Sequence, residues 1–188
     1  MKLLQLVPVG ECQLRTIEQL GPALAERFGV PWDVLGEPLN ADSAFHAERR
    51  QYHSTEILGR LHALAGQECW RILGVTDFDL YIPILTFVFG EAQMGGSVAV
   101  VSTHRLHQQF YGLPADEAVF QERLLKESLH ELGHTLDLRH CEDYRCAMAG
   151  SHAVEWIDLR DPFLCEACKT QVDPDLRCNR IEENRLLF

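Results

Sequence analysis

Three histidines and one glutamate lie within the eleven residues HELGHTLDLRH. On a helix, His130 and His134 are four positions apart, so both imidazoles project from one face and can bind the same metal ion. Glu131 is the carboxylate that an HExxH motif uses as a general base. His140 lies six residues beyond His134, too far for the same helical face, so the chain must leave the helix and turn beneath the metal.

Three neutral imidazole nitrogens are a typical ligand set for a catalytic zinc ion. They leave one coordination position open, and a water molecule there has its pKa lowered to about 7. The sequence therefore predicts a hydrolytic zinc centre. Since HExxH is the motif of metalloproteases, we expect the substrate to be a peptide or protein.

A second cluster of potential ligands follows directly. Its members are Cys141, Cys146, Cys165 and Cys168, with four residues between the first two and two between the last two. Such paired spacing is typical of a tetrahedral structural zinc site, in which four thiolates leave no open position. Because Cys141 follows His140, we expect this second site to fix the direction in which His140 leaves the helix. Disulfides in a secreted domain are the alternative, which the lack of an export signal disfavours.

The other cysteines and histidines are expected to have no chemical role. Seven cysteines, an odd number, favour reduced thiols in this setting. Cys12, Cys69 and Cys178 stand apart and are expected to be small inert residues. His104 and His107 lack a matching carboxylate or cysteine pattern, so they are expected to be surface or packing residues.

Composition indicates one globular domain. The chain has 188 residues, 46% of them hydrophobic, and a net charge of −11, which disfavours binding to nucleic acid. Pro8 interrupts the short apolar N-terminus, which is therefore expected to be a strand and not a signal peptide. No segment approaches the roughly 20 apolar residues that span a bilayer. We expect a soluble cytoplasmic monomer that does not bind membranes.

The hydrophobic pattern predicts strands alternating with helices, and hence an α/β (α+β) fold built on a twisted mixed sheet. Strands are expected at residues 3–9, 31–35, 72–75, 80–89 and 98–101. A first helix is expected over residues 14–28, ended by Gly29. Ser54 is the expected N-cap of a second helix, whose apolar side carries Ile57, Leu58, Leu61 and Leu64.

The histidine pair is expected on a long buried helix. Asp116 is its predicted N-cap, and its apolar stripe consists of Phe120, Leu124, Leu125, Leu129, Leu132 and Leu136. After His140 the periodicity is lost. We therefore place a boundary near residue 138, between an upper α/β subdomain (about 1–138) and a smaller irregular subdomain (about 139–188).

The histidine motif, the four cysteines and Met148 together resemble the archaemetzincin family of zinc metallopeptidases, and residues 71–96 also look like that family. In metzincins, HExxHxxGxxH is followed by a methionine in a tight turn. The resemblance implies a metzincin-like zincin fold and two zinc ions per chain. It makes His130, His134 and His140 ligands of the catalytic zinc, Glu131 the general base and Met148 a hydrophobic floor. The four cysteines would bind the second zinc.

Two positions depart from the metzincin pattern. Asp137 stands where the motif has glycine, a residue suited to the left-handed conformation that ends a helix. Asp adopts this conformation at a cost of roughly 1 kcal/mol, so the fold should survive. The direction in which His140 points toward the metal, and hence catalytic efficiency, is what the substitution affects. Gly150 stands where some metzincins have a tyrosine near the metal, so no oxyanion stabiliser besides zinc is predicted.

The predicted mechanism has Glu131 take a proton from water and deliver it to the leaving amine. Residues 87–91 are the candidate edge strand along which substrate lies extended. Arg139 and Asp158 are expected to be surface charges. Two alternatives stay open: a noncatalytic two-zinc protein that binds peptides or regulates, and a hydrolase of a nonpeptide amide.

Overall fold

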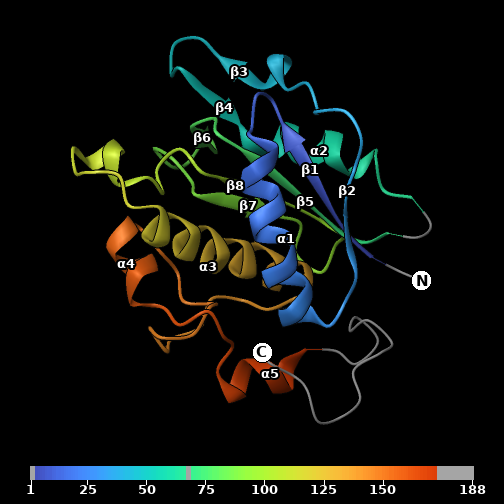
Figure 1. Cartoon of the computed structure of the whole chain (residues 1–188), viewed down its shortest axis with the longest axis vertical. Helices are drawn as coiled ribbons and strands as arrows, with labels where there is room; N and C mark the ends of the chain where they lie inside the picture. The colour runs from blue at the N-terminus through green and yellow to red at the C-terminus, as the bar shows by residue number, and fades with distance from the viewer. Residues whose placement is uncertain (1–2, 67–68, 173–188) are drawn as a thin grey trace.

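The computed structural model describes residues 3–66 and 69–172, and a five-stranded sheet lies at its centre (Figure 1). The strand order is β2-β1-β5-β8-β7. The strands are β1 (Leu3–Val9), β2 (Trp32–Val34), β5 (Cys69–Thr76), β7 (Gly90–Ala92) and β8 (Val98–Ser102). Four of them are parallel, whereas β7 runs antiparallel to β8 and forms one edge. The expected mixed sheet is confirmed.

Alternate side chains of the parallel strands pack into two hydrophobic cores, one on each face of the sheet. On β1, Leu4 and Leu6 belong to one core, and Val7 and Val9 belong to the other. The helices α1 (Leu14–Phe28) and α3 (Glu117–Thr135) cover the first face, and α2 (Ser54–His62) covers the second. Strands buried on both faces are nearly continuous apolar runs, which is why β1 and β5 were visible in the sequence.

Two helix ends follow the sequence prediction. The C-cap of α1 is Gly29, at φ 62°, and its N–H donates to the carbonyl of Ala25. At the start of α3, the side chain of Asp116 accepts a hydrogen bond of 3.1 Å from the N–H of Val119. The helix that carries the histidine pair is therefore capped at its N-terminus as expected.

The segment before α2 contains more structure than its sequence pattern indicated. It includes the 3₁₀ helix η1 (Asp42–Ala44) and the strands β3 (Phe45–His46) and β4 (Gln51–His53). These strands form a second sheet with β6 (Leu80–Tyr81), in the order β3-β4-β6. Strands of two or three residues are too short for an alternating pattern to reveal them.

The expectation of one strand over residues 80–89 is wrong. Only β6 is a strand there, and the chain then forms a loop up to β7. Side chains hold this loop: Arg49 Nη2 donates to the carbonyls of Leu85 and Thr86 at 2.7 and 3.2 Å. Gln51 Nε2 also donates to the carbonyl of Thr86, at 2.9 Å. These bonds occupy carbonyls that a strand would pair with its neighbour.

The expectation that Ser54 caps α2 is also wrong. The N-cap is His53, and the buried Ser54 hydroxyl donates to the carbonyl of Tyr81 at 3.1 Å. A buried hydroxyl needs a partner, and here the partner lies on β6. Leu64 lies beyond the end of the helix and is 39% exposed, so it is not part of the apolar side.

The chain after α3 lies beneath that helix in Figure 1. It contains α4 (Val154–Leu159) and α5 (Glu166–Gln171). The remaining element, the 3₁₀ helix η2 (Gln108–Tyr111), lies before α3 in the chain. Leu138, Met148 and Ile157 are buried in the same core as α1 and α3. Among the helices that the structure describes, none has the length and apolar character needed to cross a membrane. Cys178 lies outside the described residues.

Candidate metal centres and active site

The three histidines of the motif converge at the C-terminal end of α3. The Nε2 atoms of His130 and His134 are 3.1 Å apart. The ring of His140 lies 5.1 Å from each of the other two rings, measured between centroids. One ring nitrogen from each histidine lies within 4.8 Å of the others, so a single ion could contact all three.

Backbone carbonyls orient two of the rings. His130 Nδ1 lies 2.9 Å from the carbonyl of Ala147, and His134 Nδ1 lies 2.7 Å from that of Leu138. A ring that donates through Nδ1 keeps the lone pair of Nε2 for a metal. Burial, reinforced by the charge of Arg160, lowers the pKa of His130 well below its usual value. His130 is therefore neutral, as a metal ligand must be.

Asp137 adopts the left-handed conformation that the motif glycine would supply. Its φ is 65°. Its N–H donates to the carbonyl of His134 at 3.0 Å, and the N–H of Leu138 donates to the carbonyl of Gly133 at 3.2 Å. This pair of bonds is a Schellman motif. The sharp end of α3 expected from the sequence is thus confirmed, and it turns the chain toward His140.

Met148 lies directly against α3 at Gly133. Its side chain is fully buried, and a Cβ atom placed on Gly133 would lie only 2.3 Å from its sulfur. Gly133 is therefore a glycine for a steric reason. Gly150 lies close to His140 in the same way, since a Cβ atom there would lie 3.3 Å from His140 Nδ1.

Glu131 is buried between α3 and the edge strand β7. Its side chain faces Gly90, where an added Cβ atom would lie 2.6 Å from Glu131 Cγ and 2.7 Å from Oε1. Burial raises the pKa of Glu131 well above its usual value, and the negative charge of Glu127 adds to the rise. A carboxyl group with a raised pKa is suited to accept and return a proton near neutral pH.

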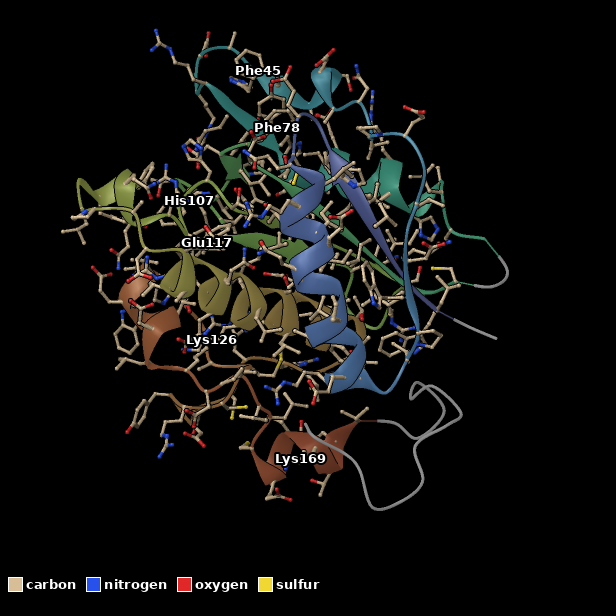
Figure 2. All side chains as sticks on the ribbon, viewed as in Figure 1. Phe45, Phe78, His107, Glu117, Lys126 and Lys169 are labelled. Carbon is tan, nitrogen blue, oxygen red and sulfur yellow. The ribbon has the colours of Figure 1, made fainter. Side chains whose placement is uncertain are left out.

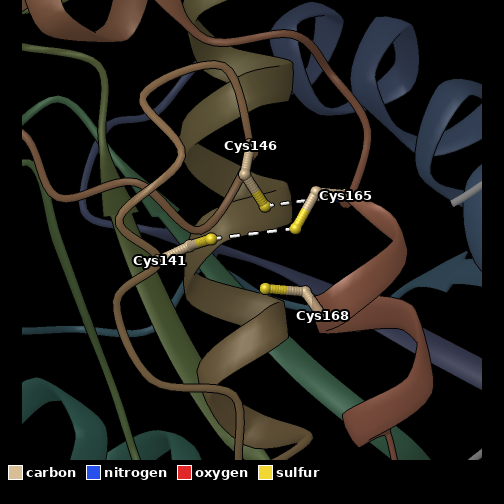
Figure 3. Close-up of side chains that lie close together, drawn as sticks. All are labelled: Cys141, Cys146, Cys165 and Cys168. Carbon is tan, nitrogen blue, oxygen red and sulfur yellow. Dashed lines mark hydrogen bonds between the residues drawn. The ribbon is translucent and has the colours of Figure 1, made fainter.

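The four cysteines of the second cluster point toward a common centre (Figure 3). Their sulfur atoms all lie within 4.8 Å of one another, and the Sγ atoms of Cys141 and Cys165 are 3.7 Å apart. All four are free thiols, so the disulfide alternative fails for them. Backbone N–H groups of Met148 and Cys165 point at Cys146 Sγ, at 3.4 and 3.3 Å. Such donors stabilise a thiolate, the form that binds zinc.

Comparisons with known proteins agree with this geometry. Residues 17–174 match the model described as peptidase family M54. The chain belongs to this family. It is 38% identical over 161 residues to an archaemetzincin of Methanocaldococcus jannaschii, in an alignment that covers 86% of this chain and 87% of the relative.

Solved structures support the same assignment for this M54 peptidase. A crystal structure of archaemetzincin from Archaeoglobus fulgidus, complexed with malonate, is 34% identical with a TM-score of 0.79. The alignment covers 92% of this chain and all of that one. A zinc-dependent peptidase from Methanocorpusculum labreanum is 27% identical with a TM-score of 0.80, covering 90% of this chain and 100% of its own. The archaemetzincin resemblance and fold class are confirmed, and the chain is a zinc metallopeptidase.

The M54 peptidase contains a buried ion pair that orients the first histidine. Arg160 is fully buried and donates through Nη2 to Glu127 Oε2. Its Nη1 donates at 3.1 Å to the carbonyl of Ala147, and this is the carbonyl that also lies within hydrogen-bond distance of His130 Nδ1. The pair therefore fixes the carbonyl that orients a candidate ligand. Nothing in the sequence pattern indicates it, because Glu127 and Arg160 are 33 residues apart.

The remaining candidates from the sequence lie away from the centre. Arg139 is exposed, and Asp158 is an exposed residue that pairs with Arg123 at 2.7 Å. His104 Nδ1 lies 3.1 Å from the carbonyl of Asp77. His107 stacks on Phe120 with ring centroids 4.0 Å apart. Both histidines thus make contacts within the fold, and neither lies at the histidine centre. The edge strand expected at residues 87–91 is β7, displaced to Gly90–Ala92.

Proposed function

We propose that His130, His134 and His140 hold the catalytic zinc ion of this peptidase and that Glu131 is its proton carrier. The observation that carries the proposal is the burial of Glu131 beside three converging imidazoles, two of which are oriented by backbone carbonyls. The donor set fits zinc, because one ring nitrogen from each of three histidines lies within 4.8 Å of the others, and three imidazole nitrogens are a usual ligand set of catalytic zinc. Zinc, when bound, supplies a Lewis acid for the scissile carbonyl and lowers the pKa of water.

Glu131 acts twice in this proposal. Its carboxylate first accepts a proton from the attacking water, and the resulting acid then delivers this proton to the leaving amine. The contact of Glu131 Oε1 with β7 supports this role, because it places the carboxylate at the strand beside which a peptide would lie.

The edge strand β7 is the proposed platform for substrate. It is the last strand of the five-stranded sheet, and such an edge can pair with an extended peptide through main-chain hydrogen bonds. Gly90 brings the backbone of this strand against Glu131 without an intervening side chain. A bound peptide would thereby run next to the proton carrier.

The four cysteines are the proposed ligands of a second, structural zinc ion, which gives two ions per chain. Their geometry supports the proposal, because four sulfurs so close together require a cation to be stable as thiolates. The N–H of Cys141 also donates at 2.9 Å to the carbonyl of Met148. The cysteine loop and the methionine turn are therefore joined, which supports a link between the two sites.

The test compares the zinc-loaded protein with Glu131→Ala on a mixed peptide library, with new termini identified by mass spectrometry. Wild type should cleave, and the variant should lose at least ~100-fold in rate at equal zinc content. Glu122→Ala is the matched control, since this carboxylate lies on the same helix but is 59% exposed.

Three results would overturn the proposal. Equal cleavage by wild type and Glu131→Ala would show that Glu131 is not the proton carrier. Zinc-loaded wild type that cleaves no peptide but hydrolyses a nonpeptide amide would favour the amide hydrolase. Zinc-loaded wild type with no activity at all would favour the noncatalytic two-zinc protein.

A further inference from the structure

A cleft of about 390 Å³ opens at the carboxyl ends of β1, β5 and β8. We call it the switch-point cleft, and its lining includes Cys12, Arg15, Asp77, Thr103, His107 and Glu117. Its volume falls within the range of roughly 300 to 1,000 Å³ that is usual for small-molecule sites. The cleft lies at the N-terminal end of α3, and at about 1.5 Å per residue Glu117 is about 20 Å along the helix from His130. It is thus separate from the catalytic centre.

The topology of the sheet favours ligand binding at this place. From β1 the chain passes through α1 to β2 on one side, whereas β5 and β8 lie on the other side of β1. The covering helices change faces at the same point, with α1 on one face and α2 on the other. In open α/β sheets, the crevice outside the strand ends at such a reversal is where ligands bind.

Thr103 is a buried residue in the lining of the cleft, and its hydroxyl has no partner in the described part of the chain. The residue is 4% exposed, and its backbone is fixed by a bond of 2.7 Å from its N–H to the carbonyl of Thr76. Within residues 3–66 and 69–172, its hydroxyl makes no hydrogen bond. The hydroxyl is not among the fully enclosed polar atoms that lack a partner, so solvent reaches it from the cleft and it is available to a ligand.

His107 supplies a second polar group. Its ring is held by stacking on Phe120, and Figure 2 shows it next to Glu117 at the start of α3. Burial lowers the pKa of His107, although the charge of Glu117 opposes this. A neutral imidazole has one donor nitrogen and one acceptor nitrogen, so His107 can bond to either kind of ligand group.

The lining of the cleft carries both signs of charge. Arg15 lies in the first turn of α1, which contains no acidic residue, and the side chain of the N-cap residue Gln13 does not bond to that turn. A positive side chain at an uncapped helix N-terminus attracts an anion. Asp77 follows β5 and Glu117 begins α3, and these carboxylates attract a cation.

We propose that the switch-point cleft binds a small zwitterion, a free amino acid or dipeptide. Its carboxylate lies at Arg15 and the N-terminus of α1, and its ammonium group lies at Asp77 and Glu117. Thr103 and His107 hydrogen-bond to these charged groups or, in a dipeptide, to the peptide group between them. Products of peptide hydrolysis have this chemistry. The proposal goes beyond the proposed catalytic function and does not depend on it.

The test is calorimetric titration of the zinc-loaded protein with the free amino acids and a panel of dipeptides. A peptide hydroxamate is present in excess throughout, because carboxylates also bind catalytic zinc. At least one compound should bind with a Kd below about 10 mM. Its N-acetylated form, which lacks the ammonium group, and its amide, which lacks the carboxylate, should each bind at least tenfold more weakly, a change of about 1.4 kcal/mol.

Variants place the binding in the cleft. Arg15→Gln and Thr103→Val should each weaken binding at least tenfold, while Thr103→Ser, which keeps the hydroxyl, should bind as wild type does. Glu26→Gln, an exposed carboxylate on α1 outside the cleft lining, is the control for surface charge. Peptidase activity of Thr103→Val should equal that of wild type, which also shows that the variant folds.

Three outcomes would overturn the proposal. The first is no binding by any compound of the panel. The second is equal binding of the free compound and its blocked forms, which would exclude a zwitterion as the preferred ligand. The third is binding that persists in both Arg15→Gln and Thr103→Val, which would place the ligand elsewhere.

Discussion

Gly133 lies where α3 passes over Met148, and it shows how closely this helix is packed onto the turn that contains the methionine. Glycine within a helix normally costs about 1 kcal/mol relative to alanine. Here the missing Cβ atom leaves room for the sulfur of Met148, which would otherwise lie 2.3 Å away. The glycine at this position therefore lets Met148 pack directly against α3, at the local cost in helix propensity.

Substituting this glycine should separate the effect of helix propensity from the effect of packing against Met148. Gly133→Ala should lower the free energy of unfolding by about 1 to 3 kcal/mol, because overpacking outweighs the gain in helix propensity. The matched control is Gly59→Ala in α2, where an added Cβ atom meets nothing within 4 Å. It should stabilise the protein by about 0.5 to 1 kcal/mol. Urea denaturation of both variants measures the difference, and stabilisation by Gly133→Ala would contradict the packing argument.

At the scale of elements, the loop between β6 and β7 depends on a partly buried carboxylate. Asp79 accepts hydrogen bonds of 2.6 and 2.7 Å from Arg105 and one of 2.9 Å from Gln51. Gln51 in turn binds the carbonyl of Thr86 within the loop. Because this loop leads into the edge strand, Asp79 contributes to the position of β7 beside Glu131.

The stability supplied by Asp79 should depend on pH. Burial opposes its ionisation, but the hydrogen bonds from Arg105 and Gln51 outweigh this and lower the pKa below its usual 3.8. A lowered folded-state pKa stabilises the protein above the unfolded pKa, and this contribution is lost as pH falls through the folded value. Asp79→Asn should therefore cost about 1.5 to 3 kcal/mol at neutral pH.

The difference between wild type and Asp79→Asn should shrink as pH falls below about 4. Urea denaturation of both proteins over a series of pH values measures it. Using the difference between the two proteins cancels the loss of metal that histidine protonation causes in each. A cost that is the same at every pH would show that Asp79 acts through packing and not through its charge.

The same elements show what a sequence can predict. The strands β1 and β5 and the helices α1 and α3 were predictable because their long apolar patterns reflect burial on a sheet or helix face. The left-handed Asp137 was predictable because the third histidine requires a sharp turn. By contrast, β3, β4 and β6 are too short for a pattern. The Glu127–Arg160 pair and the bonds to the loop carbonyls join residues far apart in the chain, so no local pattern predicts them.

At the scale of the whole molecule, the two candidate metal centres share one piece of chain. His140 and Cys141 are adjacent, and Cys141 pairs with the methionine turn through a bridge to Ala149 and a hydrogen bond to Met148. Met148 in turn contacts α3 at Gly133. Loss of the cysteine site should therefore affect His140, although none of the four thiols belongs to the histidine cluster.

Cys165→Ser tests this connection. Cys165 is far from His140 in the sequence, whereas Cys141 is adjacent to it. An effect of Cys165→Ser on His140 would therefore have to pass through the cysteine site as a whole. The variant should lose one equivalent of zinc and about 10-fold to 100-fold in kcat/KM, the range typical when a residue that supports a metal ligand is removed. Cys69→Ser, a cysteine on β5 outside the cluster, should keep both ions and full activity.

Metal analysis by plasma mass spectrometry and peptide cleavage, measured on the same samples, distinguish the outcomes. If Cys165→Ser lost one zinc ion but kept its activity, the second site would stabilise the fold without aiming His140. If it kept both ions and full activity, Cys165 would be neither a ligand of the second zinc ion nor part of a connection to His140. A joint loss of zinc and kcat/KM means that His140 depends on a metal site that takes no part in the reaction, because the chain that leaves α3 at Asp137 is fixed at its other end by the cysteines.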